Sequence, residues 1–220
     1  MSEGTVILLN GVTSAGKSTV AVALQALLEP IYYHLSFDHY NVALHGDLPA
    51  LRDLATYRRM QPNLARGYHR AVAGITRGGN HLIADTVLKR PWWPADCARQ
   101  LAPLRAYFIS VTCPLETVEK REIERGNRIP GSARAQLDSV HTYEVYDFEV
   151  DTGLHSAEAC AGGIAAFVRE HPPRAFREIL ERIEREGDPP GPEGEKGQHP
   201  AEAPAERGLV LPEEEPDLHF

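Results

Sequence analysis

The sequence predicts an α/β fold, a parallel sheet covered by helices on both faces, for most of its 220 residues. Apolar runs typical of buried strands alternate with segments whose apolar residues recur at helical spacing. Such alternation favours a parallel sheet, because each strand needs a helical crossover before the next parallel strand. A glycine-rich loop between the first strand and the first helix is the second observation.

The pattern of apolar residues gives the order of the elements. The strands are predicted at residues 5–10, 31–36, 80–85, 105–112 and 147–151. The helices between and after them are predicted at 17–28, 51–78, 94–102, 114–125, 133–140 and 156–170. Pro114 suits the first turn of a helix, Gly126 the end of that helix and Ser156 a helix N-cap. The chain is long enough for one well-buried core and too short for two ordinary domains.

The C-terminal part of the chain has a different composition. Residues 1–171 form the predicted domain, and residues 172–187 begin with Pro172-Pro173 and allow one short charged helix. Residues 188–220 are rich in Pro and Glu and contain nine acidic and two basic side chains, which is −7 of the total net charge of −8. We expect this acidic tail to be disordered, because it has little apolar surface to bury.

Composition also limits the partners. The remainder of the chain is nearly neutral, so it lacks the basic surface that nucleic-acid binding requires. No apolar run approaches the length of a membrane span, and no early segment has the pattern of a secretory signal. The three cysteines, Cys97, Cys113 and Cys160, have no metal-ligand spacing and are expected to be reduced core thiols. We expect a cytoplasmic protein that acts on a small molecule; a homo-oligomer is left open.

The run from Gly11 to Ser18, GVTSAGKS, has the spacing of a P-loop, two glycines with four residues between them followed by Lys and Ser. It lies between a predicted strand and a predicted helix, which is the context that this motif requires. Backbone N–H groups of such a loop surround phosphates, the lysine reaches the β and γ oxygens, and the serine hydroxyl can bind Mg²⁺. We therefore expect the P-loop NTPase kinase fold, with the strand order 2-3-1-4-5, and the cofactors ATP and Mg²⁺. The residues expected to bind the nucleotide are Gly11, Thr13, Ser14, Ala15, Gly16, Lys17, Ser18, Thr19 and, further along the chain, Arg121.

Two acidic residues follow predicted strands, at the sheet edge where ligands bind in open parallel sheets. Asp85 ends an apolar strand and is expected, with Ser18, to support Mg²⁺. Asp38 is expected to accept the proton of an attacking hydroxyl group. The alternative for each is an Asp that caps the next turn or helix.

A basic segment follows the fourth strand. Arg121 and Arg125 are four residues apart on one helix face, and Arg128 follows a glycine. Guanidinium groups suit the equatorial oxygens of a transferring phosphoryl group, so Arg125 and Arg128 join Lys17 and Asp38 as candidate catalytic residues on a mobile lid. The alternative is a solvated charged helix, in which the arginines pair with Glu119, Glu122 and Glu124.

Taken together, these stretches resemble chloramphenicol 3-O-phosphotransferase and its P-loop relatives. The resemblance rests on Ile7–Gly11, Ser14–Ser18, Phe37-Asp38, Leu82–Asp85 and the block Arg121–Val168, and covers about residues 5–169. It implies Asp38 as the base, Lys17 and Ser18 as phosphate and Mg²⁺ contacts, and Arg125 and Arg128 as lid groups. Residues 39–79, which would form the acceptor pocket, differ from the family pattern, although Tyr40 and Tyr57 are candidates to line it.

We therefore expect an ATP-dependent O-phosphotransferase whose acceptor is a small-molecule hydroxyl, with chloramphenicol-like antibiotics among the candidates. A metabolite kinase of the shikimate or gluconate type is an alternative on the same fold. A nucleotide-binding regulatory module without transfer activity is an alternative of another class.

Overall fold

A computed structural model describes residues 3–45, 54–125, 131–141 and 145–191. Its strands are β1 (Thr5–Asn10), β2 (Tyr32–Ser36), β3 (His81–Thr86), β4 (Arg105–Thr112) and β5 (Phe148–Asp151). They form a parallel five-stranded sheet in the order β2-β3-β1-β4-β5. The predicted fold class and strand order are confirmed.

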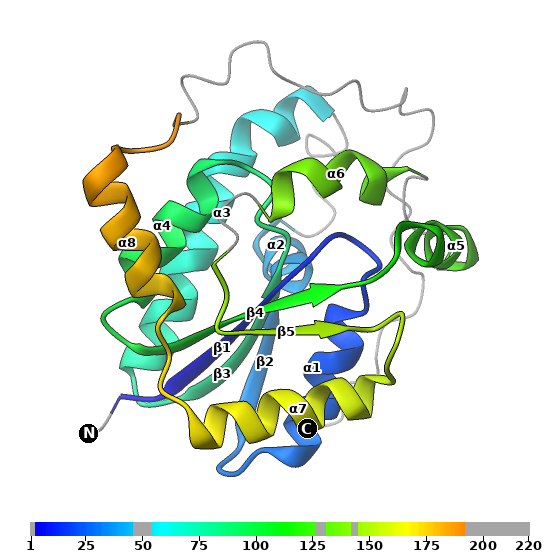
Figure 1. The fold of residues 1–220 in the computed structure, drawn as a ribbon. Helices are drawn as coiled ribbons and strands as arrows, with labels where there is room; N and C mark the ends of the chain where they lie inside the picture. The colour runs from blue at the N-terminus through cyan, green and yellow to red at the C-terminus, as the bar shows by residue number, and fades with distance from the viewer. Residues whose placement is uncertain (1–2, 46–53, 126–130, 142–144, 192–220) are drawn as a thin grey trace.

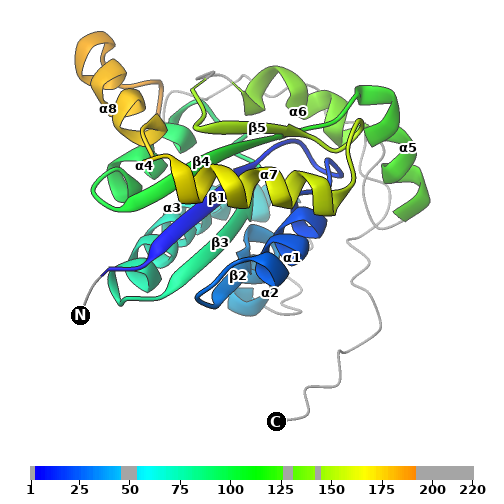
Figure 2. The same ribbon diagram turned by 60° about the horizontal axis from the view of Figure 1, so that its bottom comes forward.

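Helices cover both faces of the sheet (Figures 1 and 2). On one face, α1 (Lys17–Leu27) and α7 (Ala157–Glu170) enclose a core that includes Ile7, Leu9 and Ile109. On the other face, α3 (Leu54–Arg77), α4 (Trp92–Leu101) and α8 (Ala175–Glu186) enclose a second core. Strand β1 is buried along its whole length, because its side chains alternate between these two cores.

Three further helices follow strands or lie above the carboxyl edge of the sheet. They are α2 (Phe37–His45), α5 (Leu115–Arg125) and α6 (Ser132–Val140). Helix α2 was not among the predicted helices, because its first residue continues the apolar run of β2 without a break. The hydroxyl of Ser36 accepts a hydrogen bond from the backbone N–H of His39 at 3.0 Å, which is an N-cap contact and ends the strand.

Helix α8 packs into the second core rather than standing apart from the domain. Phe176, Ile179 and Ile183 are buried there, and Phe176 stacks on Phe108 of β4 with ring centroids 4.8 Å apart. The buried carboxylate of Asp147 accepts hydrogen bonds from the backbone N–H groups of Phe108 and Ala175, so it ties the start of α8 to the sheet. The expectation of a disordered tail falls, from residue 192 on, outside the described residues.

Within the described residues, no helix is both long and apolar enough to cross a membrane. The three cysteines are buried and free of disulfides, as the sequence predicts. Burial raises the pKa of the Cys97 thiol, which keeps this side chain in its neutral form. Cys97 and Cys160 therefore act as small apolar core residues of the two opposite faces.

Candidate active site

The predicted phosphate-binding loop joins β1 to α1 at the carboxyl edge of the sheet. Its backbone requires glycine at two positions. A Cβ atom on Gly11 would lie 2.1 Å from the carbonyl oxygen of Val111, and Gly16 has a φ angle of 90°. Ser14 also has a positive φ, 58°, which is uncommon for a residue with a side chain and typical of functional loops.

The side chain of Lys17 lies along this loop. Its buried ammonium group donates to the carbonyl oxygens of Gly11 at 3.0 Å and Val12 at 2.9 Å. These carbonyl oxygens are hydrogen-bond partners of the buried cation. The lysine side chain is thus held along the loop.

Polar groups of the loop fit a phosphate. The hydroxyl of Ser14 is buried and has no hydrogen-bond partner among the described residues. Gly16 is the N-cap residue of α1 and has no side chain, so no side-chain cap occupies the first-turn N–H groups. A helix N-terminus whose N–H groups have no side-chain cap attracts anions. Ser18 and Thr19 lie exposed in that first turn, whereas Thr13 and Ala15 are buried. Their roles in nucleotide and metal binding stay predictions.

Asp85 is the penultimate residue of β3, the strand next to β1, which leads into the loop. Its carboxylate is nearly buried and lies 2.6 Å from Nε2 of His34 on β2, while its backbone carbonyl accepts a hydrogen bond from Tyr68. Asp85 lies beside Leu9 in the register of the sheet, on the face that α1 covers. The sequence did not predict His34 as its partner. The role of Asp85 toward Mg²⁺ stays a prediction.

Asp38 lies exposed in the first turn of α2, at the same edge of the sheet. Tyr57 of α3 is close enough that the charge of Asp38 affects it: burial raises the pKa of Tyr57, hydrogen bonds from Gln61 and Asn41 lower it, and Asp38 raises it. The hydroxyl of Tyr57 accepts a hydrogen bond from the Asn41 amide at 3.1 Å. Asp38 therefore borders a polar cluster built by α2 and α3.

Aromatic side chains pack beneath this cluster. Ring contacts join Phe37 and Tyr40 to Tyr68, and Phe37 to Trp93. Trp93 and Tyr68 are fully buried, so they form core rather than an open pocket wall. Phe37 and Tyr40 are half-buried and remain candidates to contact an acceptor. Tyr143, an aromatic residue of the block Arg121–Val168, lies outside the described residues.

Arg121 reaches the phosphate loop through Thr152, which the sequence did not single out. Its guanidinium donates to the hydroxyl of Thr152 at 3.0 Å and to its carbonyl oxygen at 2.9 Å. The same hydroxyl donates to the carbonyl oxygen of Ala15 at 2.7 Å. Arg121 thereby links α5, the segment after β5 and the phosphate loop. Its direct contact with a nucleotide stays a prediction.

The structure does not test the predicted catalytic roles of Arg125 and Arg128. Arg125 is the last residue of α5, but its side chain lies outside the described residues, as does Arg128. The acidic neighbours have partners of their own. Glu119 pairs with Arg134 at 2.8 Å, Glu124 with Lys120 at 3.8 Å, and the buried Glu122 accepts from the backbone N–H groups of Gly131 and Ala133. Glu122 is thus a helix cap for α6 and not part of a solvated face.

Helix α6 lies over the phosphate loop in both ribbon views (Figures 1 and 2). Gln136 accepts a hydrogen bond from the backbone N–H of Thr13 at 2.8 Å. At the end of α6, the carbonyl oxygen of Val140 accepts from the buried amide of Asn10, the last residue of β1. The Asn10 amide also donates to Tyr146, and its oxygen accepts from the N–H of Leu88. One side chain thus connects α6 with the segments after β1 and β3.

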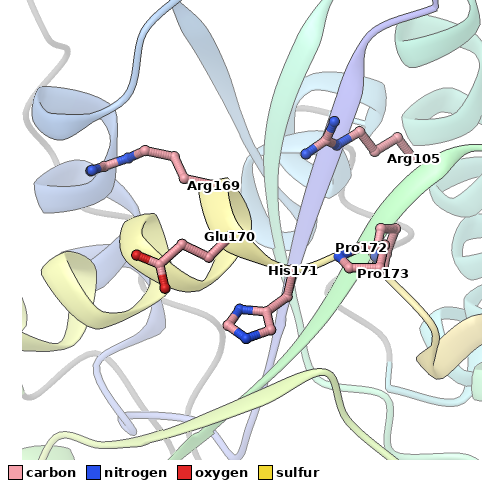
Figure 3. A pocket seen from close by; sticks show the side chains of 6 residues that line it. All are labelled: Arg105, Arg169, Glu170, His171, Pro172 and Pro173. Carbon is pink, nitrogen blue, oxygen red and sulfur yellow. The ribbon is translucent and has the colours of Figure 1, made fainter.

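The structure holds a cavity of about 350 Å³ at the opposite edge of the sheet (Figure 3). Arg105, the first residue of β4, and His171, which follows α7, line it. Because parallel strands start at this edge, it lies across the sheet from the phosphate loop. Nothing in the described parts of the chain forms a group of His, Cys, Asp or Glu able to hold a metal ion without another ligand.

Comparison with known proteins assigns the family. The sequence model described as "Chloramphenicol phosphotransferase-like protein" matches residues 4–169. The chain belongs to this family. Two Mycobacterium tuberculosis proteins named "Putative O-phosphotransferase", from strains CDC 1551 / Oshkosh and ATCC 25618 / H37Rv, are each 31% identical over 207 residues. The alignment covers 83% of this chain and 91% of each relative.

Solved structures, two kinases among them, share the fold of this chain. A Mycobacterium tuberculosis APS kinase, solved with AMPPNP and APS, has a TM-score of 0.61 and 15% identity, over 77% of this chain and 100% of that one. A shikimate kinase from Acinetobacter baumannii has a TM-score of 0.55 and 19% identity, over 76% and 93%. A tunicamycin resistance protein from Deinococcus radiodurans has a TM-score of 0.58 and 18% identity, over 78% and 99%. Family and fold together support a P-loop phosphotransferase.

Proposed function

We propose that this protein transfers the γ-phosphate of ATP to a hydroxyl group of a small molecule. The observation that carries the proposal is that the predicted phosphate-binding loop and the exposed carboxylate of Asp38 follow strands of one parallel sheet and lie at the same edge of it. The family membership of the chain supports the same reaction class.

In this proposal the phosphate loop binds the triphosphate. Lys17 leaves the carbonyl oxygens of Gly11 and Val12 and pairs with phosphate oxygens, which gives its charge a stronger partner. Ser18 and Asp85 would hold Mg²⁺, and the ion would supply positive charge against the phosphate oxygens. Removal of Mg²⁺ by a chelator should therefore abolish transfer.

Asp38 acts as the general base. Its carboxylate is exposed at the carboxyl edge of the sheet, so an acceptor hydroxyl can reach it. The hydroxyl oxygen attacks the γ-phosphorus as its proton passes to Asp38, and ADP leaves with the bridging oxygen. Arg125 and Arg128 contact the transferred phosphoryl group from the lid.

The acceptor is a compact, partly apolar molecule with an exposed hydroxyl. The surroundings of Asp38 support this, because they combine the polar groups of Asn41 and Tyr57 with the half-buried rings of Phe37 and Tyr40. The specificity of a site of this kind depends on which of its polar groups form hydrogen bonds with the bound substrate. Chloramphenicol-like antibiotics are the first candidates by family, and related natural products and sugar-like metabolites come next.

The test is a panel of hydroxylated small molecules, including chloramphenicol, shikimate and gluconate. Release of ADP is measured for each, and every product is weighed by mass spectrometry. We expect at least one molecule to gain one phosphate group, and this transfer should require Mg²⁺. Phosphorylation of shikimate or gluconate alone would favour a metabolite kinase. ATP binding without any phosphorylated small molecule would favour the regulatory module.

A further inference from the structure

The hydrogen bond between Gln136 of α6 and the backbone N–H of Thr13 joins a helix directly to the phosphate loop. The amide oxygen of Gln136 accepts this N–H at 2.8 Å, across 123 positions of the chain. Thr13 is buried, so its N–H needs a hydrogen-bond partner, and Gln136 provides it. Gln136 supplies an oxygen at a place where the loop would otherwise offer its N–H to a phosphate oxygen.

The position of Thr13 identifies which phosphate is involved. The lysine of a P-loop reaches the β- and γ-phosphates, while the N–H groups nearer the helix surround the inner phosphates. In this structure the Lys17 ammonium rests on the carbonyls of Gly11 and Val12, the two residues that precede Thr13. Thr13 therefore lies at the end of the loop where the terminal phosphate belongs.

Helix α6 is anchored so that Gln136 stays near the loop. At its N-terminal end, the buried Glu122 holds the N–H groups of Gly131 and Ala133. At its C-terminal end, Asn10 holds the carbonyl oxygen of Val140 at 2.9 Å. A helix fixed at both ends keeps its middle residue in reach when a phosphate oxygen takes the N–H of Thr13.

We propose that Gln136 binds the terminal phosphate of the nucleotide. This inference rests on the proposed function, in which ATP occupies the loop. The phosphate oxygen replaces the amide oxygen on Thr13 N–H, and the amide group then turns so that its NH₂ donates to the phosphate. A glutamine can do both, because its side chain carries an acceptor and two donors.

The test compares ATP with ADP, which lacks the terminal phosphate. Gln136→Glu keeps an oxygen for Thr13 N–H in the empty loop but places a carboxylate against the γ-phosphate. Gln136→Ala removes both functions. Gln100→Glu, on α4 away from the loop, is the matched control for the added charge. The dissociation constants of both nucleotides are measured by calorimetry with Mg²⁺, after thermal denaturation has verified that each variant is folded.

We expect Gln136→Glu to weaken ATP binding at least tenfold and Gln136→Ala about fivefold, since one hydrogen bond contributes about 1 kcal/mol. ADP binding should change by less than about twofold in both variants, and Gln100→Glu should affect neither nucleotide. Equal losses for ATP and ADP, or no loss for either, would overturn the proposal and leave Gln136 as a structural contact. Failure of the unaltered protein to bind ATP would instead refute the proposed function.

Discussion

The hydroxyl of Thr152 donates a hydrogen bond of 2.7 Å to the carbonyl oxygen of Ala15 in the phosphate loop. The same hydroxyl accepts from Arg121 at 3.0 Å, so one side chain joins the loop to α5. The contact thus couples the predicted phosphate-binding loop to α5, the helix that precedes Arg128 in the sequence.

Replacement of Thr152 by Val should therefore impair nucleotide binding. The valine methyl groups preserve the shape of the side chain but leave a charged donor and the Ala15 carbonyl without this partner. We expect the KM for ATP to rise about five- to tenfold and the free energy of unfolding to fall by about 1–3 kcal/mol. Steady-state kinetics and urea denaturation measure the two effects. Thr152→Ser, which keeps the hydroxyl, should stay close to the unaltered protein; equal effects of both substitutions would refute the coupling.

Glu122 should be a strong determinant of stability. Its carboxylate is 1% exposed and caps α6 through two backbone N–H groups. Glu122→Ala leaves these donors without a charged acceptor, so we expect a loss of about 1–3 kcal/mol in the free energy of unfolding. Glu124 is exposed on α5, the helix that also carries Glu122. Glu124→Ala is therefore the control and should change the free energy of unfolding by less than about 0.5 kcal/mol. Similar losses for the two variants would count against a capping role.

The stability of the protein should fall on mild acidification because of His69. Burial lowers the pKa of this imidazole below its ordinary value, against the opposing hydrogen bond to Asp96 at 2.7 Å. His69 therefore stays neutral in the folded protein at pH values, below about 6.5, at which it is protonated in the unfolded chain. The contribution of neutral His69 is complete above that pH and is lost as the pH falls toward the lower folded pKa.

Urea denaturation at intervals between about pH 7.5 and pH 5 measures this dependence. His69→Gln, which cannot take up a proton, should show a shallower decline than the unaltered protein. Parallel curves for the two proteins would mean that other groups cause the decline. His141 is another histidine that can contribute, because burial lowers its pKa. The charge of Glu149 opposes this shift, and the smaller effect of the charge of Lys17 adds to it.

Asp38→Asn should separate catalysis from binding. The amide keeps the shape of the carboxylate but cannot take the proton of the acceptor, so turnover should fall about 10²- to 10⁴-fold. ATP affinity, measured by calorimetry, should stay within about twofold of the unaltered protein. Glu170→Gln, at the opposite edge of the sheet, is the control and should keep full turnover. A collapse of ATP affinity with unchanged turnover would assign Asp38 to the nucleotide site instead.

Local patterns in the sequence predicted the strands of the sheet and the phosphate loop, because strand, loop and helix there are consecutive. The strand order was predicted from the P-loop kinase fold as a whole. Local patterns also put Asp38 and Asp85 at strand ends. The contacts that complete the site, in contrast, join residues that lie far apart in the sequence. Gln136 reaches Thr13 across 123 positions and Thr152 reaches Ala15 across 137, so only the folded sheet brings them together. Helix α2 escaped prediction for a local reason, since the capping residue Ser36 ends an apolar strand that runs directly into Phe37.

The fate of the terminal phosphoryl group of ATP tests the proposed transfer most directly. ATP labelled with oxygen-18 at the nonbridging oxygens of that group is incubated with Mg²⁺, the protein and the best acceptor of the panel. We expect the acceptor to gain a phosphate carrying the label, joined through its own hydroxyl oxygen, in equal amount to the ADP formed. Lys17→Ala should abolish this product, because the transition state then lacks the cation of the phosphate loop. Labelled inorganic phosphate with no labelled acceptor, or an unimpaired Lys17→Ala variant, would contradict the proposed transfer.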